Sequence, residues 1–373
     1  GIAILGDVFV SALKAIAPLL VFFLVISSLC NAGKSHGGVI KTVIILYMFS
    51  TVLAAVIAVF ASMAFPVKMT LANAATDTSA PQGIVEVLNN LLLNVVANPV
   101  SSLVNANYVG ILMWAVLLGL AFRVADKMTK KVLADVADGI SMVVTWIINL
   151  APFGIFGLVF NTVSTNGLDI FTTYGKLLIL LVGCMLFIYF VTNPLLVYWC
   201  IRQNPYPLIF HCLKRSALTA FFTRSSAANI PVNMKVCEEM GLDRDTYSVT
   251  IPLGATINMD GAAITITVMT MATAFTLGIH VDIPTAIILS LLAALSACGA
   301  SGVAGGSLLL IPMACSLFGI SDDISMQVVA VGFIIGVVQD SVETALNSSS
   351  DLLLSASAEF RQWRLEGKEI KFK

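Results

Sequence analysis

The fold of this chain is decided by a polar tip and a helix break that follow each other closely: Thr223-Arg-Ser-Ser226, then Pro252-Leu-Gly-Ala-Thr-Ile-Asn-Met-Asp-Gly261. The tip separates two short apolar stretches, 208–222 and 227–240. A helix of about 13–15 residues reaches only about 20–22 Å, whereas the hydrocarbon core of a membrane is roughly 30 Å thick. Two half-length helices joined by a polar tip therefore predict a re-entrant hairpin.

The same arrangement recurs further along the chain. A run of small residues, 299–306, divides the apolar segment 283–319, and the polar run 339–351 then interrupts the next apolar segment. The chain crosses the membrane between the two hairpins. If the first hairpin enters from one side, the second therefore enters from the opposite side. Such inverted repeats are typical of secondary transporters, which bind substrate near the midplane. The run 299–306 could instead be a seam for helix packing.

The composition indicates an integral membrane protein. Of the 373 residues, 58% are hydrophobic and 11% are charged, whereas a soluble domain averages about a quarter charged. The balance of 20 Lys and Arg against 21 Asp and Glu argues against a nucleic-acid partner, because binding phosphates requires a basic face. The expected surroundings are therefore a lipid bilayer.

Stretches without Asp, Glu, Lys or Arg mark the candidate spans in the first half: 15–33, 42–67, 87–122, 139–168 and 177–201. Each is long enough to cross once, because a span needs about 20 apolar residues. The third contains Asn98-Pro99 and Asn105-Ala106-Asn107 and should bend. Barrel strands would show roughly 10-residue alternating segments. The sequence therefore predicts an all-α, multi-span membrane protein with two re-entrant hairpins and two broken helices.

The distribution of Lys and Arg predicts the orientation of these spans. The loops 34–41, 123–131 and 202–215 are rich in basic residues, whereas 68–86 and 166–176 are poor in them. Basic loops stay on the cytoplasmic side. We therefore expect a cytoplasmic C-terminal tail.

Ionisable residues at apparent membrane depth are the candidates for function, since each costs roughly 3 kcal/mol there. They are Arg224, Asp260, Asp340, Glu343 and Asp351. Four acids against one base leave negative charge that a bound cation could neutralise, and hard cations prefer carboxylate and carbonyl oxygens. The residues Asp340, Thr344, Asn347 and Asp351 are spaced three or four apart and so share one helix face.

Plainer interpretations stay open for several of these positions. Asp260 could cap a simple kink, Asp351 could be a solvated group near the interface, and Glu343 could face a polar lumen without touching a ligand. Other hydroxyl residues could serve helix packing alone; these are Ser225, Ser226, Tyr47, Ser50 and Thr51.

Four motifs carry a family resemblance: Thr223-Arg-Ser-Ser-Ala-Ala-Asn-Ile-Pro231, Pro252-Leu-Gly-Ala-Thr-Ile-Asn-Met-Asp-Gly261, Gly302-Val-Ala-Gly305 and Asn347-Ser-Ser-Ser-Asp351. Together they resemble the dicarboxylate/amino acid:cation symporters, the glutamate-transporter family, over nearly the whole chain. Within that family the chain looks most like the bacterial sodium-coupled serine/threonine symporters. The family has eight spans and two hairpins, so this chain is expected to start at the second span. A homotrimer in the bacterial inner (plasma) membrane is implied.

The resemblance implies two structural units and a tail. Residues 1–203 would form mainly the scaffold, although helices at 40–66 and 172–201 would also contact the moving unit. Residues 204–358 would form the transport core, and 359–373 a cytoplasmic tail. The core would consist of hairpin 206–241, broken helix 245–278, hairpin 283–319 and broken helix 322–357.

A substrate site between the hairpin tips is implied as well. Ser225 and Ser226 of the first tip, with Val303 of the second, would enclose the substrate backbone. Asn347 would bind the substrate carboxylate, and Asp340 its ammonium group.

Three sodium sites follow from the same resemblance, with ligands from the helix breaks, the outer hairpin and the 42–67 span. The ligands would be Gly254, Asn258, Asn347 and Asp351 at the first site; Thr256, Ala297, Cys298 and Ala300 at the second; and Tyr47, Ser50, Thr51, Asn258 and Asp260 at the third.

The chain departs from the acidic-substrate members of the family at two positions. They carry Arg where this sequence has Glu343 and Thr where it has Ala262. The side-chain carboxylate of an acidic substrate, aspartate or glutamate, would then lie near Glu343 without a partner. Burying two unpaired like charges together costs free energy. A neutral substrate whose hydroxyl bonds to Glu343 or Thr344 fits better, although Arg224 could supply the missing guanidinium.

These features predict sodium-driven symport of serine and threonine by alternating access, with no enzymatic activity. Proton coupling through Glu343, or an acidic amino acid or dicarboxylate substrate, is an alternative within the same family. An intramembrane aspartyl protease would use Asp260 and Asp340 as a dyad sharing a proton, but two re-entrant hairpins have no purpose there.

Overall fold

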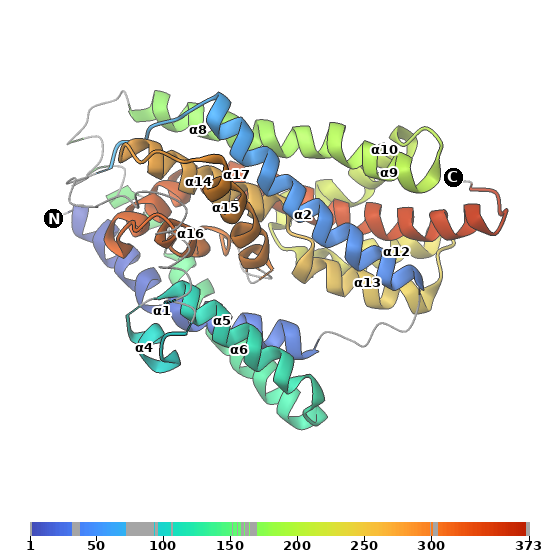
Figure 1. Cartoon of the computed structure of the whole chain (residues 1–373), viewed down its shortest axis with the longest axis horizontal. Coiled ribbons are helices and arrows are strands. Elements are labelled where there is room, and N and C mark those ends of the chain that lie inside the picture. The colour runs from blue at the N-terminus through green and yellow to red at the C-terminus, as the bar shows by residue number, and fades with distance from the viewer. Residues whose placement is uncertain are drawn as a thin grey trace.

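The computed structural model describes residues 2–31, 38–71, 93, 96–105, 107–150, 152–154, 156–157, 160, 164, 170–298, 300 and 305–370. Throughout these residues the regular structure is helical, without a strand, so the prediction of an all-α protein is confirmed. Most helices run along the long axis of an elongated bundle (Figure 1).

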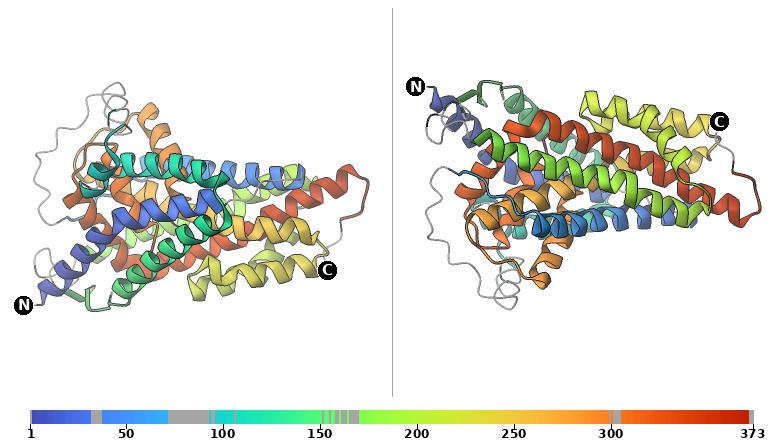
Figure 2. Two further views of the ribbon diagram at one scale, coloured as in Figure 1. Left: turned by 90° about the horizontal axis from the view of Figure 1, so that it is seen from below. Right: turned by 90° about the horizontal axis from the view of Figure 1, so that it is seen from above.

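One group of helices comes from the first half of the chain. In it, α1 (Ala3–Asn31) lies against α5 (Tyr108–Ala121) and α6 (Lys127–Asn149), and the short α4 (Pro99–Val104) precedes α5. The view from below in Figure 2 shows these helices side by side. We call them the scaffold group.

The bend expected in the third span is confirmed. The side chain of Asn98 accepts a hydrogen bond from the backbone N–H of Val100 at 2.9 Å, and that of Asn107 accepts one from Gly110 at 3.2 Å. Each Asn therefore begins a new helix, since its side chain satisfies a free N–H of the first turn. Residues 87–92, 94, 95 and 106 of this span lie outside the described residues.

The fourth span begins earlier than predicted. The charge-free stretch placed it at 139–168, but α6 starts at Lys127. Its first turns expose Lys131 and Asp135 while Ala137 and Val144 are buried. An amphipathic helix tolerates charged residues on its outer face. The charge-free stretch therefore coincides with only part of α6.

The second group of helices surrounds the long helix α17 (Asp322–Leu365). It includes α2 (Gly38–Ala64) and α8 (Ile170–Phe187), which continues through a π-helical turn, Ile188–Thr192, into α9 (Asn193–Ile201). The view from above in Figure 2 shows α8 and α9 lying along α17. We call this the core group.

The first hairpin is present. Its first arm runs through α10 (Tyr206–Cys212), a π-helical segment, Leu213–Ala217, and α11 (Leu218–Thr223). The chain reverses at Arg224, whose φ of 50° is left-handed. Its second arm is α12 (Ser226–Glu239), which packs against α11.

The first helix break is confirmed at the predicted position. The helix α13 (Arg244–Ile257) ends at Asn258, whose φ and ψ are −97° and 81°. Met259 is also non-helical, and α14 (Asp260–Thr276) begins directly afterwards. Asn258 and Met259 therefore occupy the gap between two helices, where backbone groups are not used by the helix ladder, and Asp260 begins the second helix.

The second hairpin is also present, although residues 299 and 301–304 of its tip lie outside the described residues. The arms are α15 (Ile283–Ala297) and a 3₁₀ turn, Leu308–Leu310, continued by α16 (Ile311–Ser316). Outside the helices, Asp282 caps α15. The hydrogen bonds from Thr285 lower the pKa of this carboxyl below its ordinary value.

The second helix break is absent, which corrects the prediction of a broken helix at 322–357. Helix α17 is continuous from Asp322 to Leu365. Its serines bond back to the preceding turn, for example Ser350 to the carbonyl of Asn347 at 3.0 Å and Ser357 to that of Leu353 at 2.7 Å. Such bonding within a turn satisfies the hydroxyls without opening the ladder.

Four of the described helical segments are long and apolar enough to cross a membrane: Gly38–Ala64, Thr172–Ile201, Arg244–Thr276 and Asp322–Leu365. The first three pack against the fourth, α17, and we count α13 and α14 in the core group as well. The two groups meet where Phe9 of α1 packs edge-on against Phe333 of α17, with ring centroids 5.4 Å apart, and where α5 contacts α16. The second hairpin therefore lies at the boundary between the groups.

Candidate functional site

The helix break and α2 surround Asp260. The hydroxyl of Ser50 donates to Oδ2 of Asp260 at 2.7 Å, and that of Thr51 lies 3.2 Å from Oδ1. The backbone N–H of Met259 donates to Thr51 at 3.2 Å. All three side chains are fully buried. The structure thus brings together three of the residues predicted for the third sodium site, and Asp260 does more than cap a kink.

A second buried carboxylate, Asp351, lies on the other side of the break. The amide of Asn258 donates to Oδ1 of Asp351 at 2.9 Å, and the hydroxyl of Tyr47 donates to the Asp351 carbonyl at 2.9 Å. Asp351 is 1% exposed, so the interpretation of it as a solvated group is wrong. Tyr47 links α2 to both halves of the site, since it also lies 3.2 Å from the carbonyl of Thr250.

Gly254 is required by the close approach of α13 to α17. A Cβ at this position would lie 2.8 Å from Cγ of Asp351 and 2.9 Å from the hydroxyl oxygen of Tyr47. Both distances are shorter than normal contacts, so a side chain would push α13 away from the two predicted ligands. The glycine therefore lets the backbone approach the carboxylate.

The electrostatics of this region favour a cation. The ion pairs Arg215–Glu239 and Lys368–Glu366 are both exposed, and neither includes a carboxylate of the helix break. Oδ1 of Asn258 is buried with no hydrogen-bond partner among the described atoms. A spare neutral oxygen beside buried carboxylates suits sodium, a hard cation that prefers oxygen ligands. No group of three or more His, Cys, Asp or Glu able to hold a metal occurs within the described ranges.

The residues predicted for the second sodium site come from α13 and the end of α15. Sγ of Cys298 lies 3.7 Å from the carbonyl of Ile257, which ends α13. The hydroxyl of Thr256 donates to the carbonyl of Leu253 at 2.7 Å, and the Ala297 carbonyl accepts from Ala300 at 2.9 Å. The second hairpin therefore touches the helix break, and the Ala297 carbonyl already has a backbone partner.

On α17, Asn347 and Asp340 face different neighbours. Oδ1 of Asn347 accepts from the backbone of Gly261 at 2.7 Å, while among the described residues its Nδ2 contacts only the thioether of Met259, at 3.5 Å. A thioether is a weak acceptor, so Nδ2 has capacity to bind a carboxylate. Oδ1 of Asp340 lies 3.3 Å from the backbone N–H of Gly305, beyond the second tip.

The remaining predicted substrate residues lie near the hairpins and α17. Ser225 accepts from the N–H of Ala228 and so caps α12, and Ser226 is buried. Thr344 is 6% exposed on α17. Val303 lies outside the described residues.

The sequence interpretation missed the partners of Glu343. Its Oε2 accepts hydrogen bonds from Thr265 at 2.7 Å, Ser307 at 2.9 Å and Gln339 at 2.5 Å. Only Gln339, four residues before Glu343 on the same helix, could have been found from spacing. Glu343 therefore does not face an open lumen.

A second polar cluster was also missed. The amide of Asn229 donates to the hydroxyl of Ser348 at 2.8 Å, and that of Asn233 donates to the Ser348 carbonyl at 2.8 Å. Ser216 on the first arm of the hairpin donates to Asn233 at 2.5 Å. These bonds join both arms of the first hairpin to α17. The two asparagines are four residues apart, and this spacing could have indicated that they share one face of the helix.

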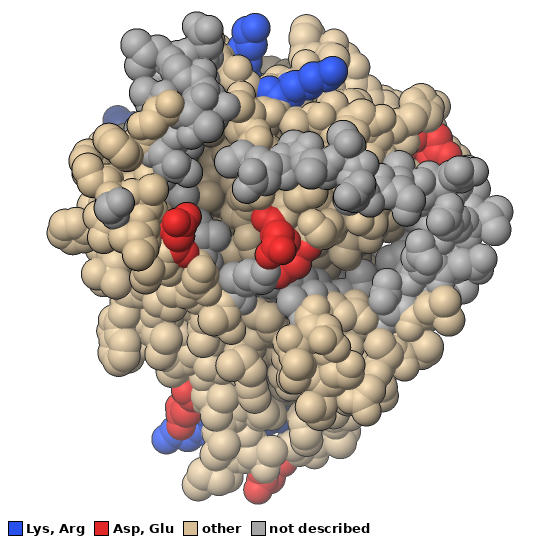
Figure 3. Space-filling model, turned by 90° about the vertical axis from the view of Figure 1, so that its left-hand side faces the viewer, with Lys and Arg blue, Asp and Glu red and all other residues tan. Residues whose placement is uncertain are grey.

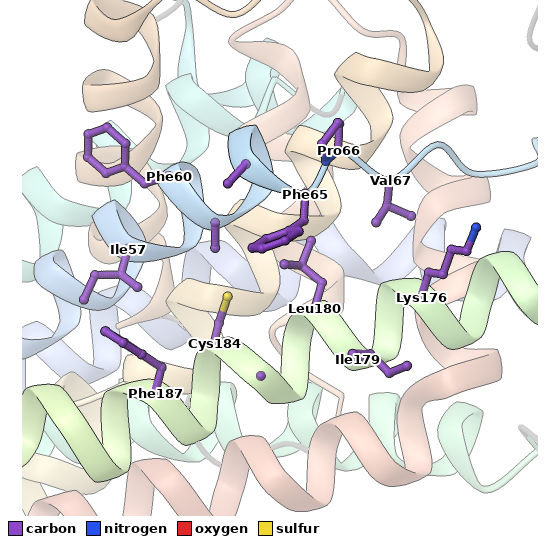
Figure 4. A pocket seen from close by; sticks show the side chains of 13 residues that line it. Ile57, Phe60, Phe65, Pro66, Val67, Lys176, Ile179, Leu180, Cys184 and Phe187 are labelled. Atoms are coloured by element: carbon purple, nitrogen blue, oxygen red, sulfur yellow. The ribbon is translucent and has the colours of Figure 1, made fainter.

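A cavity of about 840 Å³ lies between α2 and α8 (Figure 4). Its walls are apolar side chains such as Phe60, Phe65 and Leu180, with Lys176 as the one charged residue in the lining. None of the predicted site residues lines it. The candidate site is instead the buried polar region at the helix break and on the facing side of α17.

Comparison with known proteins places the chain among membrane transporters. Residues 1–359 match the family described as the Sodium:dicarboxylate symporter family. The chain is also 59% identical over 366 residues to the serine/threonine transporter SstT of Bifidobacterium adolescentis. That alignment covers 98% of this chain and 85% of the relative.

Proposed function

The chain belongs to the sodium:dicarboxylate symporter family, and from this premise we propose that it takes up serine and threonine together with sodium ions. It is a membrane-embedded transporter and not an enzyme. The protease alternative, which used Asp260 and Asp340 as a catalytic dyad, is therefore set aside.

One observation carries the choice of serine and threonine: the 59% identity, over 98% of the chain, to a relative named as a serine/threonine transporter. The surroundings of Glu343 support the same choice. Its three hydrogen-bond donors are neutral side chains, so none of them would compensate the charge of a second carboxylate from an acidic substrate. A hydroxyl can donate to Glu343 instead.

The substrate would bind along α17 between the two hairpins. We assign its carboxylate to Nδ2 of Asn347 and its ammonium group to Asp340, with Thr344 beside its side chain. Ser225 and Ser226, with Val303 of the second tip, would close around the backbone. The weakly partnered Nδ2 of Asn347 supports this assignment.

Sodium is the second substrate in this proposal. The first site would combine Asp351 with carbonyls at Gly254, Asn258 and Asn347; the second would combine Thr256 with carbonyls at Ala297, Cys298 and Ala300; the third would combine Asp260 with Tyr47, Ser50, Thr51 and Asn258. Oδ1 of Asn258 has no partner among the described residues, while the Nδ2 of the same amide donates to Asp351, and this supports the first and third sites. Sodium would hold the two sides of the break together.

Alternating access would move the core group against the scaffold group. Helices α2 and α9 are tied to the core by side chains. Tyr47 bonds to Asp351, and Arg364 donates to the carbonyl of Cys200 at 3.1 Å. We therefore propose that α2, α8 and α9 move with residues 204–358, while α1 and α4–α6 remain static. The family resemblance further implies a homotrimer formed through the scaffold.

The orientation follows from the two ends of the bundle. The end of α9, the start of α10 and the C-terminal end of α17 lie together in Figure 1, so the basic stretch 202–215 and the tail share one end. Figure 3 views the other end, which carries acidic side chains near the middle of the face and Lys or Arg side chains at its upper edge. The basic stretch 202–215 lies at the same end as the tail and supports a cytoplasmic C-terminus in a bacterial inner (plasma) membrane.

Uptake of labelled serine into proteoliposomes tests the proposal. We expect uptake under an imposed sodium gradient, competition by threonine, and little competition by aspartate. Uptake driven by a proton gradient without sodium would favour the proton-coupled alternative, and strong competition by aspartate would favour an acidic substrate.

A further inference from the structure

Three side chains from three different elements converge on one oxygen of Glu343. Thr265 comes from α14, Ser307 precedes the 3₁₀ turn that begins the second arm of the outer hairpin, and Gln339 lies one turn earlier on α17. Gln339 also donates to the hydroxyl oxygen of Thr265 at 2.8 Å. The four residues are all buried. The network therefore connects α14, the second arm of the outer hairpin and α17 through one carboxylate.

The network leaves the other oxygen of Glu343 available. All three bonds end on Oε2, and within the described residues no donor to Oε1 is recorded. Helix α14 also packs closely on Glu343, since a Cβ on Gly261 would lie 2.9 Å from its Cα and its Cγ. The carboxylate is therefore held in one orientation, with one oxygen saturated and one still able to accept.

We infer that Thr265, Ser307 and Gln339 are positioning residues that aim Oε1 of Glu343 at the hydroxyl of a bound amino acid, and so select hydroxylated over plain neutral substrates. This inference rests on the proposed function and adds the residues that set its selectivity. A fixed acceptor oxygen binds the hydroxyl of serine or threonine, whereas an alanine side chain leaves this buried oxygen without a donor. A site built to bond a hydroxyl rejects the analogue that lacks it far more strongly than an apolar pocket does.

The position of Ser307 connects this selectivity to the outer hairpin. Its bond to Glu343 exists only when the second arm lies against α17, as it does here. Closing the hairpin therefore completes the orientation of the carboxylate after the substrate has entered. Serine and alanine should consequently be distinguished when the outer hairpin lies closed against α17. This closed state is the one from which the substrate is carried across the membrane.

The test compares the KM for serine with the inhibition constant for alanine in proteoliposomes driven by a saturating sodium gradient. Thr265→Val removes the hydroxyl and keeps the shape, and Thr265→Ser restores a donor. Thr267→Val is the matched control, because Thr267 is buried on the same helix and its hydroxyl has no partner among the described residues. Ser307→Ala, with Ser307→Thr as its conservative partner, gives an independent variant should Thr265→Val fail to fold.

We expect Thr265→Val and Ser307→Ala each to lower the preference for serine over alanine about tenfold, the size of one hydrogen bond to a charged group. Thr265→Ser, Ser307→Thr and Thr267→Val should keep most of the wild-type preference. Equal changes for serine and alanine, or no change, would mean a purely structural role and would overturn the inference. Absence of serine uptake by the wild-type protein would instead count against the proposed function, so the two failures are distinguishable.

Discussion

Asn258 and Asp351 meet across the gap between the helix break and α17, with Nδ2 of Asn258 2.9 Å from Oδ1 of Asp351. Both residues are buried. The other amide atom of Asn258, Oδ1, has no partner within the described part of the chain. The pair therefore presents a negative charge and a spare neutral oxygen together, which is what a sodium site requires.

Removing the charge of Asp351 should weaken sodium binding. Asp351→Asn keeps the size of the side chain, and we expect the sodium concentration for half-maximal serine uptake to rise at least about tenfold, because losing a buried charged partner costs about 2–5 kcal/mol. Uptake measured against sodium concentration checks this. Asp135→Asn, on the exposed face of α6, is the control. An unchanged sodium dependence in Asp351→Asn would remove this carboxylate from the ion sites.

Adding a methyl group at Gly254 should disrupt transport more than folding. Gly254→Ala would place a Cβ 2.8 Å from Oδ1 of Asp351, and overpacking of this kind costs about 1–3 kcal/mol. We expect a large fall in uptake for equal amounts of folded protein. Gly336→Ala is the control, since nothing lies within 4 Å of its Cβ position. Equal activity of the two variants would show that the contact does not matter.

Ser50 should tune the site at Asp260. Ser50→Ala removes the 2.7 Å bond to Oδ2, and hydrogen bonds to charged groups contribute about 1.5–3 kcal/mol. We expect weaker sodium activation, by about tenfold. Ser62→Ala on the same helix is the matched control, because Ser62 is buried and its hydroxyl has no partner among the described residues. Similar sodium curves for both variants would contradict the assignment of Ser50.

The cluster around Ser348 should contribute to stability more than to ion binding. Asn233→Ala would remove the acceptor of the Ser216 hydroxyl and the amide that donates to the Ser348 carbonyl, at a cost of about 1–3 kcal/mol. We expect the Tm of the purified protein to fall by a few degrees, with sodium affinity unchanged. Asn31→Ala, at the exposed end of α1, should leave the Tm unaltered. A wild-type Tm in Asn233→Ala would show that these bonds do not hold the hairpin.

The sequence predicted the first helix break because several local signals agree there. Asn258 and Asp260 are polar residues in an otherwise apolar helix, and they follow Pro252 and Gly254. The second break was predicted from the polar run 339–351 and from the family resemblance, but these polar residues do not interrupt the helix. The hydroxyls of α17 bond within its own ladder, so the helix remains continuous.

The site was only partly readable from the sequence. The resemblance supplied the residues around Asp260 and Asp351, and the structure brings these together. The partners of Glu343 were not accessible in the same way, because Thr265 and Ser307 are 78 and 36 positions away from it. Only the packing of α14 and the outer hairpin against α17 brings them within hydrogen-bonding distance.

The most direct test of sodium-coupled transport is to reverse the gradient. Proteoliposomes loaded equally inside and outside with labelled serine should accumulate serine when sodium is higher outside, and lose it when sodium is higher inside. Because coupled ions and substrate must move together, both directions are required. Serine that stays at equal concentrations under either sodium gradient would contradict the account.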